Sequence, residues 1–163
     1  MKKLLTGLLI LTLCTSAFAE DKAAKFTDPI HGFTINAPDL GPSKQVLTPV
    51  IFSGPVDSGF SANVSVRIQP GADKIKSYIA ANLAQLADMK ATVVSQKQLT
   101  VSGCDAVLIE FQATINGTAM HFLSLSVLQP DKIYIVTGTA LDSNYAKYEE
   151  AFKKCIDSFA LPK

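Results

Sequence analysis

The chain has 163 residues and a formal net charge of +1, and 48% of its residues are hydrophobic. This length predicts one domain with a hydrophobic core large enough to fold without a structural metal. The lysines are scattered and Arg67 is the sole arginine. A near-neutral chain of this kind lacks the basic surface that nucleic-acid-binding proteins carry, so no nucleic-acid partner is expected.

The N-terminus has the pattern of a secretory signal peptide covering residues 1–19. A basic start, Lys2-Lys3, precedes an apolar run of eleven residues, and Ala17 and Ala19 have the A-x-A spacing of a cleavage site. The run is too short for a membrane-spanning helix, which needs about 20 residues. Cleavage after Ala19 makes Glu20 the first residue of a mature chain located in the periplasm or secreted beyond it.

A lipid anchor at Cys14 is the alternative to this cleavage. A lipoprotein peptidase cuts directly before its cysteine and favours a small residue there, whereas this chain has the bulky Leu13. We therefore favour the cut after Ala19, which discards Cys14. The rest of the sequence has no apolar run long enough to span a bilayer, so no transmembrane anchor is expected in the mature form.

Two cysteines, Cys104 and Cys155, are retained in the mature chain. Because an exported protein meets oxidising conditions, this even number favours a disulfide between them. The bond would close a loop of about 50 residues and contribute roughly 4 kcal/mol in the chain-entropy model. Two separate buried thiols are the alternative, and the distance between the two Cα atoms decides between them.

After the signal peptide, residues 20–25 are expected to form a flexible leader and residues 26–163 a single domain. An alternating pattern predicts a first strand at 33–37. A second strand is predicted at 46–52, at a sheet edge or a bulge because it contains Pro49, and Ser53-Gly54-Pro55 is expected to end it.

The segment FSANVSVRIQ, residues 60–69, gives one of the clearest strand signals. Its apolar residues alternate with polar ones, so one face is expected to be buried and the other wet. Asp73 is then expected to cap a helix that runs to about Met89. The predicted core face of that helix consists of Ile75, Tyr78, Ile79, Leu83 and Leu86.

Four strands in a meander are predicted from Thr92 to Ala140. The turns are expected at Ser102-Gly103, Asn116-Gly117 and Pro130-Asp131, and Asn-Gly between alternating runs is the strongest short hairpin signal. A final helix is predicted at 143–159, capped by Asp142 or Ser143, with one apolar face made of Tyr145, Tyr148, Phe152, Cys155 and Phe159. The expected fold is an α+β sandwich, in which two helices flank one antiparallel sheet of about six or seven strands.

The sequence carries no known catalytic motif, neither a nucleophile elbow, a zinc-protease helix, a phosphate-binding loop nor a C-x-x-C pair. His121 lies in an apolar strand and is interpreted as a strand histidine with an ordinary hydrogen bond. His31 follows Asp28 by three residues, which suits a turn better than a metal site, because two ligands make a weak site. Glu110 is either a partly buried acid or part of an exposed strand face. No metal or cofactor is therefore expected.

Two stretches, FTDPIHGFTINAP near the start and KIYIVTGTALDSNYAKYEEAFKKCIDSFAL at the end, resemble the PsbP-like family, which includes the DcrB-type bacterial envelope proteins. The order of elements is similar over most of the mature chain. The resemblance implies a central antiparallel sheet with helices on both faces. It also implies an accessory protein that docks on a larger assembly, as the photosynthetic members dock on the oxygen-evolving complex. No functional residue carries over, because the matched positions are core and turn positions.

Three functions are open at this point, in decreasing order of preference. The first is a non-enzymatic periplasmic accessory module that docks on an envelope protein through a sheet edge or a loop patch. The second is a carrier of a small apolar ligand between a helix and the sheet. The third is an enzyme of unfamiliar type that uses His31, Arg67, Glu110 or His121, which requires these residues to share one surface. A secreted effector is a further alternative to the first.

Overall fold

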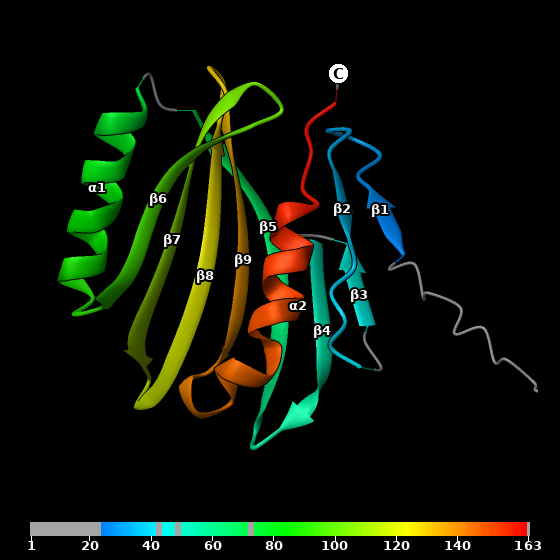
Figure 1. Cartoon of the computed structure of the whole chain (residues 1–163), viewed down its shortest axis with the longest axis vertical. Coiled ribbons are helices and arrows are strands. Elements are labelled where there is room, and N and C mark those ends of the chain that lie inside the picture. The colour runs from blue at the N-terminus through cyan, green and yellow to red at the C-terminus, as the bar shows by residue number, and fades with distance from the viewer. Residues whose placement is uncertain (1–23, 42–43, 48–49, 72–73, 163) are drawn as a thin grey trace, which may run out of the picture.

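The computed structural model describes residues 24–41, 44–47, 50–71 and 74–162. Figure 1 shows a twisted antiparallel sheet with one helix toward each of its sides and a small hairpin beside the second helix. This arrangement confirms the predicted α+β sandwich. The predicted signal peptide with its cleavage residues, most of the predicted leader, and Asp73 lie outside the described residues.

The main sheet has seven strands in the order β3-β4-β5-β9-β8-β7-β6, and β1 and β2 form a separate pair. All neighbouring strands are antiparallel. In chain order the elements are β1 (Lys25–Thr27), β2 (Thr34–Asn36), β3 (Lys44–Leu47), β4 (Val50–Asp57), β5 (Phe60–Pro70), α1 (Ile75–Asp88), β6 (Thr92–Val101), β7 (Cys104–Ile115), β8 (Thr118–Leu128), β9 (Lys132–Leu141), the 3₁₀ turn η1 (Asp142–Asn144) and α2 (Tyr145–Asp157).

The predicted meander is confirmed, and its turns have the expected chemistry. At Asn116-Gly117 the φ angles are 50° and 80°, and at Ser102-Gly103 they are 51° and 81°. Two successive residues with positive φ define the tight hairpin turn whose twist matches that of the flanking strands. The last of these strands, β9, pairs with β5, and this long-range pairing joins the meander to the N-terminal strands in one sheet.

Several predicted boundaries were wrong. The strand predicted at 46–52 is a hairpin of two strands, and β4 continues through Ser53-Gly54-Pro55, where a register shift between Ser53 and Val56 accommodates the proline. Lys25, the last residue of the predicted leader, is the first residue of β1. Neither Asp142 nor Ser143 caps α2, because Asn144 occupies the N-cap position and makes no side-chain cap hydrogen bond.

One face of the sheet is covered by α2 and the β1–β2 pair over its central strands. Five residues of α2 are buried: Tyr145, Tyr148, Phe152, Cys155 and Ile156. The pair is held against this helix by a hydrogen bond from the Asn36 backbone N–H to Ser158 Oγ, at 2.7 Å. Gly138 in β9 allows the close approach of the helix, since a Cβ at this position would lie 2.7 Å from Cγ of Phe152.

The opposite face is covered only in part, by α1, which lies along the β6–β7 side of the sheet (Figure 1). Only three residues of this helix are buried, namely Tyr78, Ile79 and Leu86. They pack against a small apolar cluster formed by Val107, Ile109, Leu128 and Ile133. Neither helix, within the described part of the chain, is long and apolar enough to cross a membrane.

Candidate functional site

His31 and Asp28 form a self-contained turn. The Asp28 Oδ1 atom accepts hydrogen bonds from the backbone N–H groups of Ile30, at 3.1 Å, and His31, at 2.5 Å. The Nδ1 atom of His31 lies 3.0 Å from the same oxygen. This carboxylate oxygen therefore organises the local backbone, as expected for a turn, and the described residues contain no group of three metal-ligating side chains.

His121 and Glu110 meet in a second place, on the face of the sheet that α2 covers. His121 Nε2 lies 3.0 Å from Glu110 Oε1, and His121 Nδ1 lies 3.2 Å from Asp142 Oδ1. The ring of Tyr145 stacks on the imidazole with 3.6 Å between ring centroids. Burial, followed by the negative charge of Glu110, raises the pKa of Tyr145 above its usual range. His121 is only 8% exposed, so this cluster has little access to a substrate.

The polar cluster around His121 therefore fits a structural role. Gln112 Nε2 donates a hydrogen bond of 2.7 Å to Asp142 Oδ1, which ties the start of η1 to β7. Ser95 Oγ donates to the second carboxylate oxygen of Glu110, at 3.2 Å. These bonds satisfy partly buried polar groups where β9 passes into α2.

The two cysteines are free thiols, so the structure does not support the predicted disulfide. Cys155 is buried in α2, and its thiol donates a hydrogen bond to the Asn36 carbonyl oxygen at 3.0 Å. Burial raises the pKa of the Cys155 thiol to about 12. A thiol of this kind is unreactive at neutral pH, because the thiolate is the reactive form. Cys104, partly buried at the start of β7, packs against the same core.

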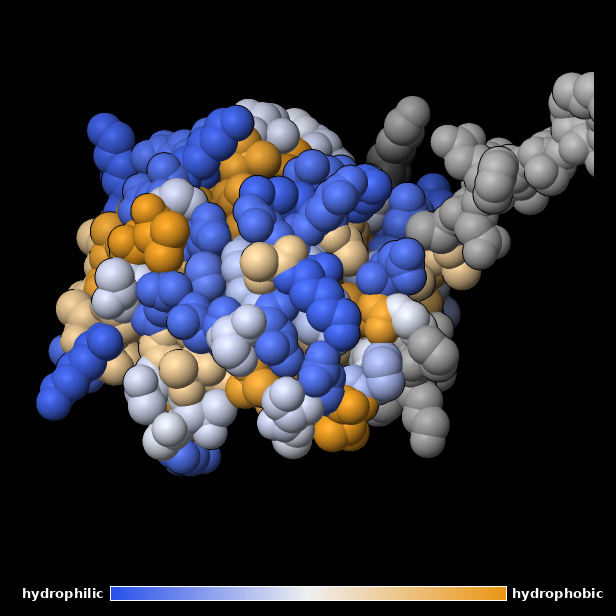
Figure 2. Space-filling model, turned by 60° about the horizontal axis from the view of Figure 1, so that its bottom comes forward, coloured by the Kyte–Doolittle hydropathy of each residue, from blue (hydrophilic) through white to orange (hydrophobic). Residues whose placement is uncertain are grey.

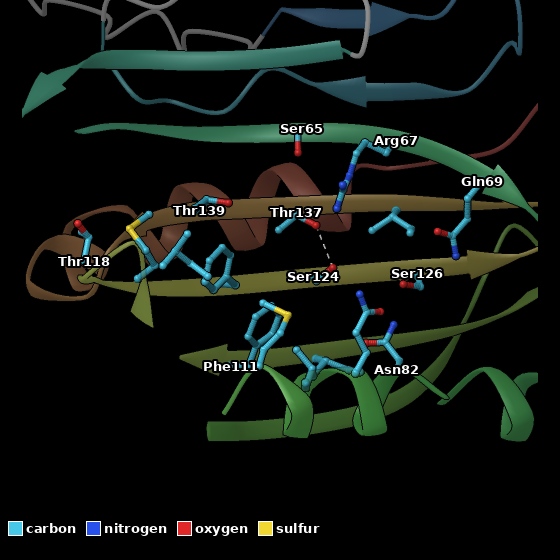
Figure 3. Close-up of a pocket in the computed structure, with 18 of the residues that line it drawn as sticks. Ser65, Arg67, Gln69, Asn82, Phe111, Thr118, Ser124, Ser126, Thr137 and Thr139 are labelled. Atoms are coloured by element: carbon cyan, nitrogen blue, oxygen red, sulfur yellow. Dashed lines mark hydrogen bonds between the residues drawn. The ribbon is translucent and has the colours of Figure 1, made fainter. Parts of the chain in front are cut away.

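Arg67 lies on the other face of the sheet, in β5, beside a large groove. The groove has a volume of about 1160 Å³ and runs between α1 and the exposed half of the sheet. In Figure 3, Arg67 and Gln69 of β5 and Asn82 of α1 lie at one end, while Phe111 and Thr118 lie toward the other. The four polar candidates named from sequence thus fall in three separate places, which counts against an active site built from them.

Hydroxyl groups line the centre of the groove. Ser124 of β8 and Thr137 of β9 are hydrogen bonded to each other at 2.9 Å; Ser65 lies on the neighbouring strand β5, and Thr139 lies two residues along β9 (Figure 3). At one end, the ring of Phe111 stacks on that of Phe122 with 4.6 Å between centroids. The groove therefore combines a polar central surface with an apolar end.

The helix α1 forms one wall of the groove and is tied to the sheet by a short polar chain. The hydroxyl group of Tyr78 donates a hydrogen bond of 2.9 Å to Ser126 Oγ in β8. Asn82 Nδ2 in turn donates to the Tyr78 hydroxyl oxygen, at 3.1 Å. Since Tyr78 and Ser126 are both buried, these bonds satisfy groups that would otherwise be costly to bury.

Sequence reasoning named Arg67 but missed the rest of the groove. Ser124, Thr137 and Thr139 interrupt otherwise apolar strands, and Phe111 and Phe122 lie on the same side of the sheet. That alternation was the available signal. It was ambiguous, because a solvated sheet face gives the same pattern as a polar binding surface.

Comparisons with known proteins place the fold. PA94, a protein of unknown function from Pseudomonas aeruginosa, has 18% identity and a TM-score of 0.63, covering 80% of this chain and 91% of its own. The PsbP protein CyanoP of Synechocystis sp. PCC 6803 has 13% identity and a TM-score of 0.61, covering 85% and 92%. LpqN, involved in cell envelope biogenesis of Mycobacterium tuberculosis, has 13% identity and a TM-score of 0.58, covering 80% and 84%.

At these identities the likeness shows a shared fold and nothing more. None of the curated proteins matches the chain. The family model of PsbP, in contrast, matches residues 21–161. This match covers nearly all of the chain that follows the predicted signal peptide, and the resemblance noted in the sequence is confirmed: the chain belongs to the PsbP family.

Proposed function

We propose that this protein is an exported, non-enzymatic accessory module that docks on a protein of the cell envelope. Membership of the PsbP family and the separation of His31, Arg67 and His121 onto different parts of the molecule support a binding role over catalysis. The predicted signal peptide supplies the route of export. The fold that the chain shares with LpqN, a protein of cell envelope biogenesis, is in keeping with this location.

The observation that carries the proposal is the exposed terminal strand β6. It lies at the end of the sheet order, and its first seven residues, Thr92 to Gln98, are all exposed. Natural proteins normally protect such an edge with charges or bulges, and here the protection is one lysine, Lys97, and a register shift between Val93 and Ser95. A partner segment can extend the sheet by adding a strand along this edge.

Exposed apolar side chains lie next to this edge. We call them the apolar margin: Met89, Val93, Val94 and Ile115, which are between 38% and 51% exposed. Figure 2 brings the lower end of the molecule forward and shows apolar surface in several places among hydrophilic residues, one of them at its left side. Apolar surface of this kind, beside an open strand, is typical of protein interaction sites.

The docking proposal is tested by cross-linking the tagged mature protein in its own envelope and identifying the captured proteins by mass spectrometry. One dominant partner is expected. Val94→Asp, in the apolar margin, should reduce its capture strongly, because a charge at the interface must be desolvated. Ile30→Asp is the matched control: Ile30 is 82% exposed but lies in the distant Asp28 turn. Capture that is absent, or equally strong in both variants, argues against docking at this edge.

A second function, binding of a small ligand, is favoured by the groove itself. Its volume of about 1160 Å³ slightly exceeds the range of about 300–1,000 Å³ that small-molecule sites usually occupy. A sealed, tightly packed interface between α1 and the sheet would have counted against this function. Native purification followed by mass spectrometry tests it, and a molecule retained at a ratio of one per chain is the expected result.

A further inference from the structure

We propose that the groove binds an amphiphile with one anionic head group, which Arg67 holds, and an alkyl chain, which lies over Phe111 and Phe122. The inference rests on the ligand-binding function proposed above and adds the chemical class of the ligand. The charge of the groove, the order of its polar and apolar residues, and the wall formed by α1 support it.

Among the residues that the structure describes, Arg67 is the only charged one that lines the groove, and no aspartate or glutamate of this part of the chain lines it. Within the described part of the chain, Arg67 makes no ion pair or side-chain hydrogen bond. A guanidinium group can form two parallel hydrogen bonds with a carboxylate or a phosphate. An arginine that faces an open groove without a competing acid therefore favours an anionic ligand group.

The register of the strands places the charge of Arg67 at one end of the groove and the aromatic rings toward the other, with Ile135 and Ile109 beside the polar side chains. Arg67 lies opposite Ile135, and Ile135 lies opposite Ser126. The next row, two residues farther along the strands, consists of Ser65, Thr137 and Ser124. The third row consists of Thr139, Phe122 and Phe111, and the last of Leu141 and Met120. Each step of two residues is about 6.7 Å, so the charge lies about 20 Å from the apolar end.

The apolar end can accept an alkyl chain because its rings are only partly covered. Phe111 and Phe122 are half-buried and stacked with an interplanar angle of 11°, which presents them as one broad surface. Met120 lies beside these rings and lines the groove, but it is only 5% exposed, so Phe111 and Phe122 provide the accessible apolar surface. Each methylene group removed from water is worth roughly a fourfold gain in affinity.

The helix α1 completes the site. Its Tyr78 fixes the helix to Ser126, in the same row as Arg67, and Asn82 lies across the groove from Arg67 in Figure 3. Leu86 and Met89 also line the groove, farther along the helix. The ligand thus has amide and guanidinium donors near its head group and apolar side chains along its chain on both walls.

The test uses the purified mature protein, stripped of bound lipid, and four probes that share one dodecyl chain. Dodecanoate and dodecyl phosphate are anionic, dodecyl maltoside is neutral, and dodecyltrimethylammonium is cationic. Binding below the micelle concentration is measured by isothermal titration calorimetry and native mass spectrometry. We expect one anionic probe to bind per chain, about tenfold more tightly than the neutral probe, because charge-assisted hydrogen bonds contribute this much affinity. The cationic probe should bind more weakly than the neutral one.

Two variants assign the two ends of the site. Arg67→Gln, at an exposed position, should weaken the anionic probes about tenfold and leave the neutral probe unchanged. Phe122→Ser should weaken all probes that bind. Lys97→Gln, on β6, is the matched control, because it removes an exposed charge that does not line the groove. Circular dichroism shows whether each variant is folded.

The outcomes separate this inference from the ligand-binding function beneath it. If the neutral and anionic probes bind equally and Arg67→Gln changes neither, the groove binds ligands but the anionic specificity is refuted. If no probe binds, both are refuted. If an anionic ligand is supported, incubation with phosphatidylglycerol vesicles shows whether it is a membrane lipid or a free fatty acid. Lipid recovered on the soluble protein indicates a membrane lipid. Binding to free dodecanoate alone indicates a fatty acid.

Discussion

The two helices of this protein cover the two faces of one sheet very differently. Five residues of α2 are buried, and they join Ile35 of β2 and Tyr134 of β9 in a single core. Three residues of α1 are buried, and the groove separates the rest of this helix from β5 and β9. The comparison indicates that one face of the sheet provides stability, whereas the other leaves surface available for recognition.

The clearest expression of this difference is strand β9, whose alternate residues belong to the two faces. Tyr134 and Val136 are 1% and 0% exposed on the α2 side. Thr137 and Thr139, which follow them on the strand, are half-buried and line the groove. Substitutions on the two sides of this strand and on the two helices should therefore differ in cost, and each of the following predictions tests that difference.

The largest effect is expected from Phe152→Ala in α2. The side chain is completely buried and packs against Gly138, Tyr145 and Tyr148. Removing the ring leaves a cavity in a tightly packed core, so the free energy of unfolding should fall by about 3–5 kcal/mol. Urea denaturation monitored by circular dichroism measures this loss. Met89→Ala, on the exposed end of α1, is the control and should change stability by about 0.5 kcal/mol or less.

The next effect compares neighbouring positions on β9. Gly138→Ala places a methyl group 2.7 Å from the Phe152 ring, which must then move. Overpacking of this kind should cost about 1–3 kcal/mol. Thr139→Ala, one residue along and on the open face, should change stability by only about 0.5 kcal/mol. Equal losses in thermal denaturation would show that the groove side of the sheet is as tightly constrained as the α2 side.

Much of this architecture could be predicted, because it is encoded locally. The turns at Ser102-Gly103 and Asn116-Gly117 fixed the meander through their positive φ angles, and alternation in β5 gave its two faces correctly. The apolar face predicted for the last helix is buried as expected, including Tyr145 and Phe152.

What failed depends on contacts between residues distant in sequence. Asp142 has the chemistry of a helix cap, yet its carboxylate accepts a hydrogen bond from Gln112 of β7 and lies beside His121 of β8. The disulfide was predicted because two cysteines, Cys104 and Cys155, follow the signal peptide. The thiol of Cys155 instead donates a hydrogen bond to the Asn36 carbonyl oxygen. The lining of the groove could not be predicted for the same reason, because a local sequence pattern does not give the distance between a helix and a sheet.

The buried thiol of Cys155 makes the α2 side sensitive to alkaline pH. Its pKa is raised from 9.0 to about 12 by burial, so the folded state favours the protonated form. The resulting stability is fully present below pH 9.0 and is lost as the pH rises toward 12, by up to about 1.4 kcal/mol per pH unit. Urea denaturation at pH 8 and pH 10 should give a shallower loss for Cys155→Ala than for the unmodified chain. Cys104→Ala should keep the full slope, and a shallower slope in that variant instead would contradict the assignment.

The smallest effect is expected where α1 is tied to the sheet. Tyr78→Phe removes the hydroxyl group that donates to Ser126 Oγ and accepts from Asn82, so it should cost about 1 kcal/mol. The loss should be concentrated in α1: its amide hydrogens should exchange faster while those of α2 are unchanged, because α1 has few other buried contacts. Tyr148→Phe is the matched control on α2. Faster exchange in both helices would mean that α1 and α2 unfold together, and that α1 is as firmly coupled to the core as α2.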